Sequence, residues 1–369
     1  MKAKAMVLIG PGRMELNEFE VVKPKSNQVL VKMAVTSVCA SDPKFFHGKT
    51  PFSDPKFFHG KTPFKGFPVI LGHELAGEVA DIGTDAAALY NLKVGDRITI
   101  EPAIPCGQCK WCRTEYNYHK CRPLRAYGAT LAADQPPHLF GGYAEYLYLL
   151  PGSIVYKLKD EVPYLAASLS SVIGNGVRWI KNLGQMTYGQ SLAISGVGSQ
   201  GLATLIAARE FGVGPIAVMG LDRDKARFEL AREFGADFTI RIEHENPLKV
   251  VPEVLGGQPD VVVETSGVPS AIQTALELVK PTGRVASIGL SGGKETPIGF
   301  DTLVVKGVTI VCDHAQAGNV EDAMRIINSR KYAIEKINNF RYHLEELPRA
   351  LEETANPPEG FIKGAVVFD

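Results

Sequence analysis

Four cysteines crowd into one short segment of this sequence. Cys106, Cys109 and Cys112 follow one another at intervals of three, and Cys121 comes nine positions later. Four thiolates on one lobe form the closed tetrahedral site of structural zinc, with no coordination position left for water. The spacing therefore predicts a structural zinc site in a lobe at about residues 95–125. Free thiols or a redox pair are the alternative.

A second group of residues offers a mixed set of metal donors. Cys39 and Asp42 lie in the segment CASD, and His73 and Glu74 lie in GHE. A thiolate, an imidazole and a carboxylate suit a catalytic zinc that keeps one coordination position open. Taken alone, however, a single histidine or cysteine is more often a packed residue. The interpretation therefore depends on the neighbouring motifs.

A glycine-rich turn follows a strand-like run and precedes a helical stretch. It reads GVGSQG and contains Gly196, Val197, Gly198 and Gly201. The first glycine permits a tight turn, the second lets the backbone approach a pyrophosphate, and the third lets helix and strand pack closely. The helix N-terminus then faces the phosphate charge. This pattern predicts a dinucleotide site.

An acidic residue at the end of the next strand-like run bears on the choice of dinucleotide. Asp222 lies 21 residues beyond Gly201. A carboxylate there accepts hydrogen bonds from the ribose hydroxyls of adenosine and repels a 2′-phosphate. The sequence therefore favours NAD over NADP, although Arg223 could partly offset that repulsion. A glycine-rich turn and a solvated aspartate without a ligand are the alternative.

These residues need two kinds of scaffold. Residues 1–159 show short β-rich runs broken by Gly and Pro, which predict a mainly β catalytic domain. Residues 160–312 alternate apolar runs with helical stretches, which predicts a doubly wound parallel sheet of the Rossmann type that binds NAD. Residues 313–369 form a segment too short for a third domain, which we expect to return to the catalytic domain.

Composition limits the classes of partner. Forty basic residues balance forty acidic ones, so no long-range field favours nucleic acid or an anionic membrane surface. No apolar run approaches the roughly 20 residues that span a bilayer. The apolar stretch near the N-terminus is too short for a signal peptide. We therefore expect a cytoplasmic protein that binds neither nucleic acid nor membrane.

An exact tandem repeat lies between Cys39 and His73. Residues 41–52 read SDPKFFHGKTPF, and residues 53–64 repeat them without a change. Structural repeats diverge and have longer periods, so the copy indicates a duplication inside one loop. We expect it to lengthen a surface loop.

Taken together and in order, the motifs resemble the medium-chain zinc-dependent alcohol and polyol dehydrogenase family over essentially the whole chain. They are Cys39, GHE at 72–74, GDR at 95–97, the cysteine lobe, GGYAEY at 141–146 and the turn at Gly196. Cys39 and His73 are 34 residues apart, and without one copy of the repeat the separation is 22, close to the family's usual spacing. The resemblance implies a GroES-like catalytic domain beside the Rossmann domain.

The resemblance also implies roles for particular residues. Cys39 and His73 would bind catalytic zinc, with Glu74 beside it as an occasional ligand and Asp42 supporting the histidine. Ser41 matches the hydroxyl that passes on the substrate proton. Three further residues match cofactor positions: Arg227 near the adenosine ribose, Leu290 near the nicotinamide carboxamide and Lys363 near the pyrophosphate.

Two positions depart from the family pattern. A further zinc ligand is usual where this chain has Ser170 or Ser171, and a serine hydroxyl is a poor ligand for zinc. Either Glu74 completes a site with Cys39 and His73, or the catalytic metal is weak or absent. Lys44 stands where the family often has a relay histidine. A lysine can relay a proton only if burial or nearby cations lower its pKa, and a solvated charge is the alternative.

The resemblance implies a reaction in which zinc acts as a Lewis acid on a secondary alcohol or polyol and NAD accepts the hydride. A zinc-free NAD(P)H quinone or enoyl reductase of the same fold is one alternative, although Asp222 and the cysteine lobe argue against it. A catalytically inactive cofactor-binding relative is another. The expected partners are a small alcohol or ketone and further copies of the chain, in a homodimer or homotetramer.

Overall fold

The computed structural model describes residues 1–48, 67–115, 117–122 and 124–369. Most of the tandem repeat, including its whole second copy, lies outside the described residues. The prediction that the repeat lengthens a surface loop therefore concerns residues outside the described part of the chain. The chain forms two compact units, one of residues 1–171 and 327–369 and the other of residues 172–326. The unit boundaries fall within helices α6 (Ser170–Arg178) and α12 (Val320–Ser329). The domain boundaries predicted near residues 159 and 312 stay predictions.

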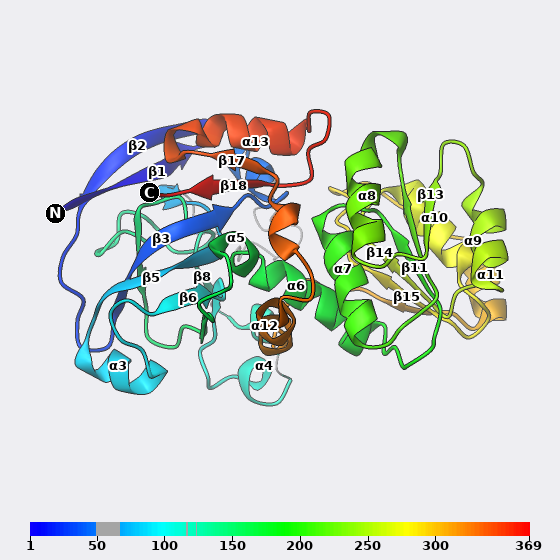
Figure 1. Cartoon of the computed structure of the whole chain (residues 1–369), viewed down its shortest axis with the longest axis horizontal. Helices are drawn as coiled ribbons and strands as arrows, with labels where there is room; N and C mark the ends of the chain where they lie inside the picture. The colour runs from blue at the N-terminus through cyan, green and yellow to red at the C-terminus, as the bar shows by residue number, and fades with distance from the viewer. Residues whose placement is uncertain (49–66, 116, 123) are drawn as a thin grey trace. The chain divides into compact units, whose positions relative to one another are not determined.

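The first unit is built on a mostly antiparallel sheet whose central strand is β3 (Val29–Ser37). This strand is rich in β-branched residues and is buried along most of its length, as a central strand should be. It pairs antiparallel with β5 (Glu74–Ile82), β9 (Tyr146–Leu149) and β18 (Gly364–Val367). The last strand of the chain therefore lies beside one of the first, as the blue and red ribbons in Figure 1 show.

The other strands of this unit complete that sheet or form smaller ones. The large sheet also contains β6 (Arg97–Ile100), β10 (Val155–Lys157) and β17 (Phe340–Tyr342). A second sheet consists of β1 (Lys2–Gly10), β2 (Arg13–Glu20) and β4 (Val69–Ile70), and a small one of β7 (Ala103–Ile104) and β8 (Arg125–Ala126).

Short helices connect and cover these sheets. They are α1 (Asp42–Phe46), α3 (Thr84–Tyr90), α4 (Lys110–Arg113), α5 (Tyr164–Ala167) and α13 (Leu347–Ala355), with single turns at Tyr118–Lys120, Ile334–Ile337 and Leu344–Glu346. Helix α13 buries Leu347, Ala350 and Leu351, which recur at helical spacing on one face. That face packs against α1 and β18.

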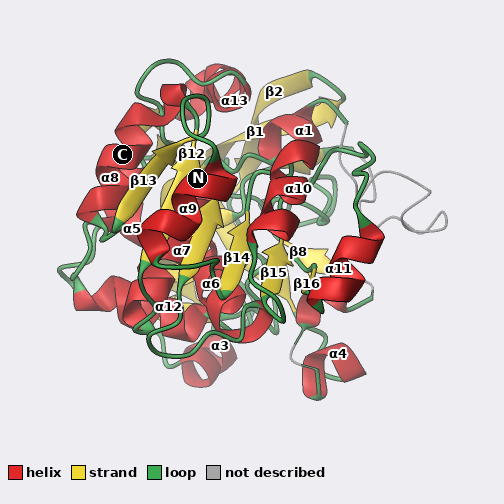
Figure 2. Cartoon of the chain, turned by 90° about the vertical axis from the view of Figure 1, so that its right-hand side faces the viewer, coloured by secondary structure: helices red, strands yellow, loops and turns green. Residues whose placement is uncertain are grey.

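The second unit contains one six-stranded parallel sheet in the order β13-β12-β11-β14-β15-β16. In chain order the strands are β11 (Leu192–Ser195), β12 (Ile216–Gly220), β13 (Phe238–Arg241), β14 (Val261–Glu264), β15 (Arg284–Ser287) and β16 (Thr309–Val311). The inner strands are buried, which explains their continuous apolar sequences. Figure 2 shows β12 to β15 running in one direction.

Helices lie on both faces of this parallel sheet. They are α7 (Ser199–Glu210), α8 (Lys225–Glu233), α9 (Pro247–Leu255), α10 (Pro269–Leu278) and α11 (Phe300–Lys306), preceded by a π-helical turn at Trp179–Leu183. Figure 1 shows α7 and α8 on one side of the sheet and α9, α10 and α11 on the other. The predicted doubly wound parallel sheet is therefore confirmed. The strand order reverses direction between β11 and β14, where ligands bind in such folds.

None of the helices in the described part of the chain has both the length and the apolar character that crossing a bilayer requires.

The turn between β11 and α7 gives a test of how tightly this unit is packed. A Cβ atom at Gly201 would collide with the carbonyl oxygen of Gly196, whereas one at Gly198 would meet no described atom within 4 Å. We expect Gly201→Ala to lower the free energy of unfolding by about 1–3 kcal/mol through overpacking. Gly198→Ala should change it by less than about 0.5 kcal/mol.

Urea denaturation of the two variants without added ligand measures both effects. Equal stability of the two would contradict the packing that the structure shows at Gly201.

A candidate metal centre and a dinucleotide loop

The register between β3 and β5 assembles the first site. Ser37, the last residue of β3, pairs with Glu74, the first residue of β5. Cys39 follows β3 by two residues and His73 immediately precedes β5. The end of one strand and the start of its antiparallel neighbour therefore bring the predicted ligands together.

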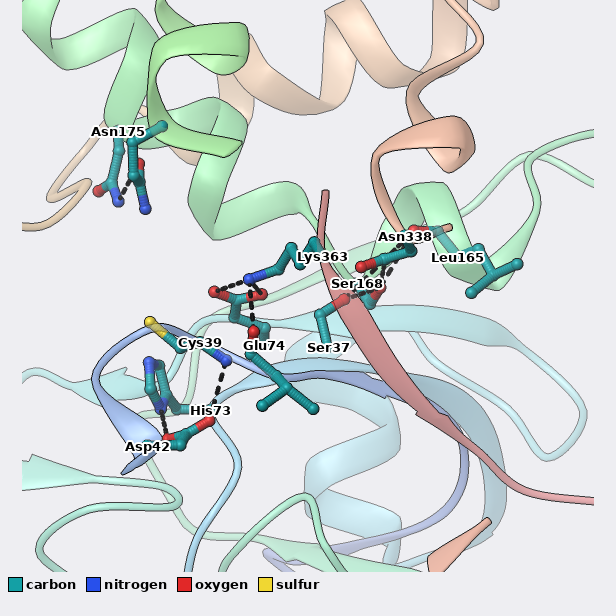
Figure 3. A network of polar contacts seen from close by, with 12 residues as sticks. Ser37, Cys39, Asp42, His73, Glu74, Leu165, Ser168, Asn175, Asn338 and Lys363 are labelled. Atoms are coloured by element: carbon teal, nitrogen blue, oxygen red, sulfur yellow. Dashed lines mark hydrogen bonds and ion pairs between the residues drawn. The ribbon is translucent and has the colours of Figure 1, made fainter. Parts of the chain in front are cut away.

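The three predicted ligands do converge. One donor atom each from Cys39, His73 and Glu74 can be chosen so that all lie within 4.8 Å of one another. Glu74 is buried, whereas Cys39 and His73 remain partly accessible. Figure 3 shows the sulfur of Cys39 and the carboxylate of Glu74 on the same side of the imidazole ring. A thiolate, an imidazole and a carboxylate in this arrangement fit a zinc ion.

Asp42 supports this group from below, as Figure 3 shows. It is the first residue of α1 and its side chain is fully buried. Its Oδ2 accepts a hydrogen bond from the backbone N–H of Cys39 at 2.9 Å and another from the hydroxyl of Tyr143 at 2.6 Å. Its Oδ1 lies 3.3 Å from Nδ1 of His73. The carboxylate therefore ties the segment carrying Cys39 to the histidine.

The charges around His73 act on its protonation. Burial lowers the pKa of the imidazole, but the negative charges of Asp42 and Cys39 outweigh burial and hold that pKa well above 6.5. A metal ion that binds the imidazole must therefore displace a proton.

Lys363 occupies a place that the sequence did not predict. Its Nζ lies 2.9 Å from Oε2 of Glu74 and donates hydrogen bonds to Oε1 of Glu74 at 3.1 Å and to the carbonyl of Val38 at 2.8 Å. Burial lowers the pKa of Lys363, but Glu74 and Cys39 outweigh it, so the net shift is upward. The ammonium pairs with Glu74 because both charges are buried and need a partner. The place near a pyrophosphate that the resemblance implies for this lysine stays a prediction.

Four other predicted residues of this region differ in their surroundings. Ser41 is half-buried just before α1, and Lys44 is exposed on α1. Ser170 shares a hydrogen bond of 2.8 Å with the hydroxyl of Thr99. Ser171 is buried, and its hydroxyl has no hydrogen-bond partner among the described residues.

The cysteine lobe brings four sulfur atoms together. One sulfur each from Cys106, Cys109, Cys112 and Cys121 lies within 4.8 Å of the others. Backbone N–H groups of Gln108 and Cys109 point at the sulfur of Cys106 and lower its pKa to about 6. Burial raises the pKa of Cys121 to about 12. Four thiols held this closely fit a cation that would favour their ionised forms.

The glycine turn of the second unit has the shape that a dinucleotide requires. Gly196 has φ +99°, a conformation that glycine adopts without strain, and helix α7 begins one residue after Gly198. The space beside the Cα of Gly198 is open within 4 Å as far as the structure describes the chain. Val197 is buried beneath the turn. A phosphate group could therefore approach the helix N-terminus closely.

The predicted ribose acceptor has a histidine and an arginine beside it. Asp222 follows β12, and its Oδ2 lies 2.5 Å from Nε2 of His244. Nη1 of Arg241 lies 3.9 Å from the other oxygen of Asp222. Arg227 instead pairs with Asp224, with Nη1 and Oδ1 2.6 Å apart. Leu290, predicted near the nicotinamide, is 53% exposed.

Sequence reasoning gave no role to two buried groups. Tyr143 lies within the GGYAEY motif, and its contact with Asp42 could not be read from that motif. Glu264 is the last residue of β14 and pairs with Ser195 of β11. Its carboxylate accepts hydrogen bonds from the backbone N–H groups of Ser266 and Gly267. Burial raises the pKa of Glu264. An acidic residue closing an apolar strand next to the glycine turn was the available signal.

Two models of known protein families match segments of this chain, one mainly in each unit. The family model described as "Alcohol dehydrogenase GroES-like domain" matches residues 25–160. The one described as "Zinc-binding dehydrogenase" matches residues 200–329.

Individual proteins agree with these matches. A Mycobacterium tuberculosis protein named "Probable alcohol dehydrogenase" is 31% identical, over 84% of this chain and 82% of its own. Sorbitol dehydrogenase of Gallus gallus is 30% identical, over 95% of this chain and 92% of its own. The crystal structure of an alcohol dehydrogenase from Thermotoga maritima superposes with a TM-score of 0.87 at 24% identity, covering 100% of this chain and 99% of that one, which shows a shared fold.

The raised pKa of His73 predicts how metal affinity depends on pH. Below that pKa a proton occupies the imidazole, so zinc affinity at this site should fall as the pH falls. We expect affinity about tenfold or more weaker at pH 6 than at pH 8. Competition with a chromogenic chelator measures the zinc affinity at each pH. The same measurement on Cys39→Ser gives the zinc binding of the cysteine lobe alone.

Asp42→Asn removes the charge that raises the pKa of His73 and should flatten the pH dependence. The same slope in Asp42→Asn and in the unaltered chain would contradict this account.

Proposed function

Because the chain belongs to the medium-chain zinc-dependent alcohol and polyol dehydrogenase family, we propose that it oxidises a secondary alcohol or polyol to a ketone with NAD as the hydride acceptor. The observation that carries the proposal is the convergence of Cys39, His73 and Glu74 above a buried carboxylate. No other group of the described residues combines thiolate, imidazole and carboxylate donors in this way.

Cys39 and His73 would hold the zinc ion, with Asp42 fixing the imidazole through Nδ1. Zinc bound there would supply Lewis acidity that lowers the pKa of an alcohol hydroxyl. Ser41, at the start of the same turn, would carry the released proton away. NAD held at the glycine turn would accept the carbinol hydrogen together with the electron pair of its C–H bond, so that one alcohol and one NAD⁺ would give one ketone, one NADH and one proton.

NAD is supported by the open face of Gly198 and by the carboxylate of Asp222. Asp222 is 44% exposed, so its carboxylate is within reach of a ribose. The guanidinium of Arg241 beside it weakens its repulsion of a 2′-phosphate, as the sequence suggested for Arg223.

One observation favours a second function. Lys363 engages both oxygens of Glu74, and a serine, Ser170 or Ser171, stands where the family usually has a further ligand. Cys39 and His73 are then the uncommitted donors. A site with two donors would bind zinc weakly, and the chain would then be a zinc-free reductase of quinones or enones. Metal content distinguishes the two functions, because the reductase would hold zinc in the cysteine lobe alone.

Two further proposals concern the oligomeric state and the cellular location of the protein. We propose a homodimer or homotetramer of this chain from the resemblance, and a cytoplasmic location from the composition. Sedimentation of the purified protein measures the first.

A panel of secondary alcohols and polyols with NAD tests the proposed reaction. We expect NADH absorbance to appear with at least one of them and Cys39→Ser to reduce turnover by about 100-fold or more, since a ligand of the metal is lost. Cys312→Ser, which alters an exposed cysteine outside both groups, is the control. Full activity in Cys39→Ser would eliminate metal-assisted chemistry at this position.

Cofactor choice gives an independent prediction. Asp222→Ala should raise the ratio of kcat/KM for NADP over NAD by about tenfold, equivalent to about 1.4 kcal/mol, because the repulsive charge is removed. Asp222→Asn keeps hydrogen-bonding capacity without the charge and should show most of the same change. An unaltered ratio in both variants would exclude Asp222 as the selective group.

A further inference from the structure

We propose that Tyr143 is a positioning residue of the metal centre: its hydroxyl holds the carboxylate of Asp42 so that the other oxygen faces Nδ1 of His73. The proposal rests on the proposed zinc site at Cys39 and His73. It assigns to Tyr143 the task of fixing the imidazole ring through an intermediate carboxylate.

The backbone of Tyr143 is held from two directions. Its carbonyl accepts a hydrogen bond from Met6 N–H of β1 at 2.9 Å, and its own N–H donates to Leu71 O at 3.0 Å. The neighbouring Ala144 forms a bridge with Ala5. The tyrosine is therefore anchored both to the first strand of the chain and to the segment that leads into His73.

Packing gives the ring a fixed place beside the histidine. Tyr143 is 0% exposed. A Cβ atom added to Gly72 would lie 3.1 Å from the ring and 3.0 Å from the backbone nitrogen of Tyr143. The residue directly before His73 thus packs closely against Tyr143.

The acceptor capacity of Asp42 explains what the hydroxyl does. Oδ2 takes two donors, Cys39 N–H at 2.9 Å and Tyr143 OH at 2.6 Å. Oδ1 lies 3.3 Å from Nδ1 of His73 as an ion-pair contact, and neither of these two atoms has a hydrogen-bond partner in the described part of the chain. Two donors on one oxygen prevent the carboxylate from rotating. Oδ1 is thereby reserved for the imidazole N–H, which leaves the other ring nitrogen as the metal donor.

Tyr127 offers a matched control. It is also 0% exposed and in the same unit, and its hydroxyl shares a hydrogen bond of 2.6 Å with Ser153 and accepts another from Leu150 N–H. These contacts involve none of the predicted metal ligands. Tyr127→Phe therefore loses comparable buried hydrogen bonds without touching Asp42.

The experiment compares zinc dissociation constants of the unaltered protein, Tyr143→Phe and Tyr127→Phe by chelator competition. We expect Tyr143→Phe to bind the zinc of the Cys39 site about 10- to 100-fold more weakly, the range found when outer partners of metal ligands are lost. Its cobalt-substituted form should show an altered visible spectrum. Tyr127→Phe should leave the zinc affinity and the cobalt spectrum unchanged. Each of the two tyrosine variants should lower the thermal midpoint of the metal-free protein.

The double variant of Tyr143→Phe with Asp42→Asn tests whether Tyr143 affects zinc binding through Asp42. Tyr143→Phe should weaken zinc binding little further in an Asp42→Asn background, since the tyrosine acts through that carboxylate. Zinc affinity of Tyr143→Phe equal to that of Tyr127→Phe, or full additivity with Asp42→Asn, would overturn the proposal while leaving the proposed function intact. Absence of zinc from the Cys39 site of the unaltered protein would overturn both.

Discussion

Asp42 has a carboxylate that is fully excluded from water, and the candidate site depends on how that charge is satisfied. A buried carboxylate without partners would cost several kcal/mol, so the surrounding chain must supply donors. Three segments far apart in the sequence do so: the turn at Cys39, the strand start at His73 and the loop at Tyr143. The contacts that satisfy this charge therefore hold Cys39 and His73, the two predicted metal ligands, in place relative to each other.

A second buried charge draws the end of the chain into the same place. Glu74 pairs with Lys363, the residue directly before β18, and β18 lies against β3 in the central sheet. The sheet pairing brings the lysine to the site, and the ion pair gives Glu74 a partner when no metal is bound. The C-terminal segment thus contributes to the chemistry of the first unit as well as to its sheet.

The sequence was sufficient where chemistry depends on local spacing. The glycine turn, the four cysteines and the strands of the parallel sheet could be read from short patterns, because each lies within a few residues of chain or repeats with a clear period. The pairing of Cys39 with His73 needed the resemblance as well, since a tandem repeat separates them. The register of β3 and β5 then accounts for it.

The contacts that sequence reasoning missed are long-range and between side chains. Lys363 and Glu74 are 289 residues apart, and Tyr143 and Asp42 are 101 residues apart. No local pattern encodes which buried charge meets which partner. In the same way, the exposure of Lys44 depends on which face of a short helix packs against the core.

Anomalous diffraction at the zinc absorption edge tests the central claim most directly. A crystal of the purified protein should give two peaks per chain, one among the four lobe cysteines and one between the sulfur of Cys39 and the imidazole nitrogen of His73 that faces away from Asp42. A peak in the lobe alone, with Cys39 and His73 empty at full zinc occupancy of the lobe, would contradict the account.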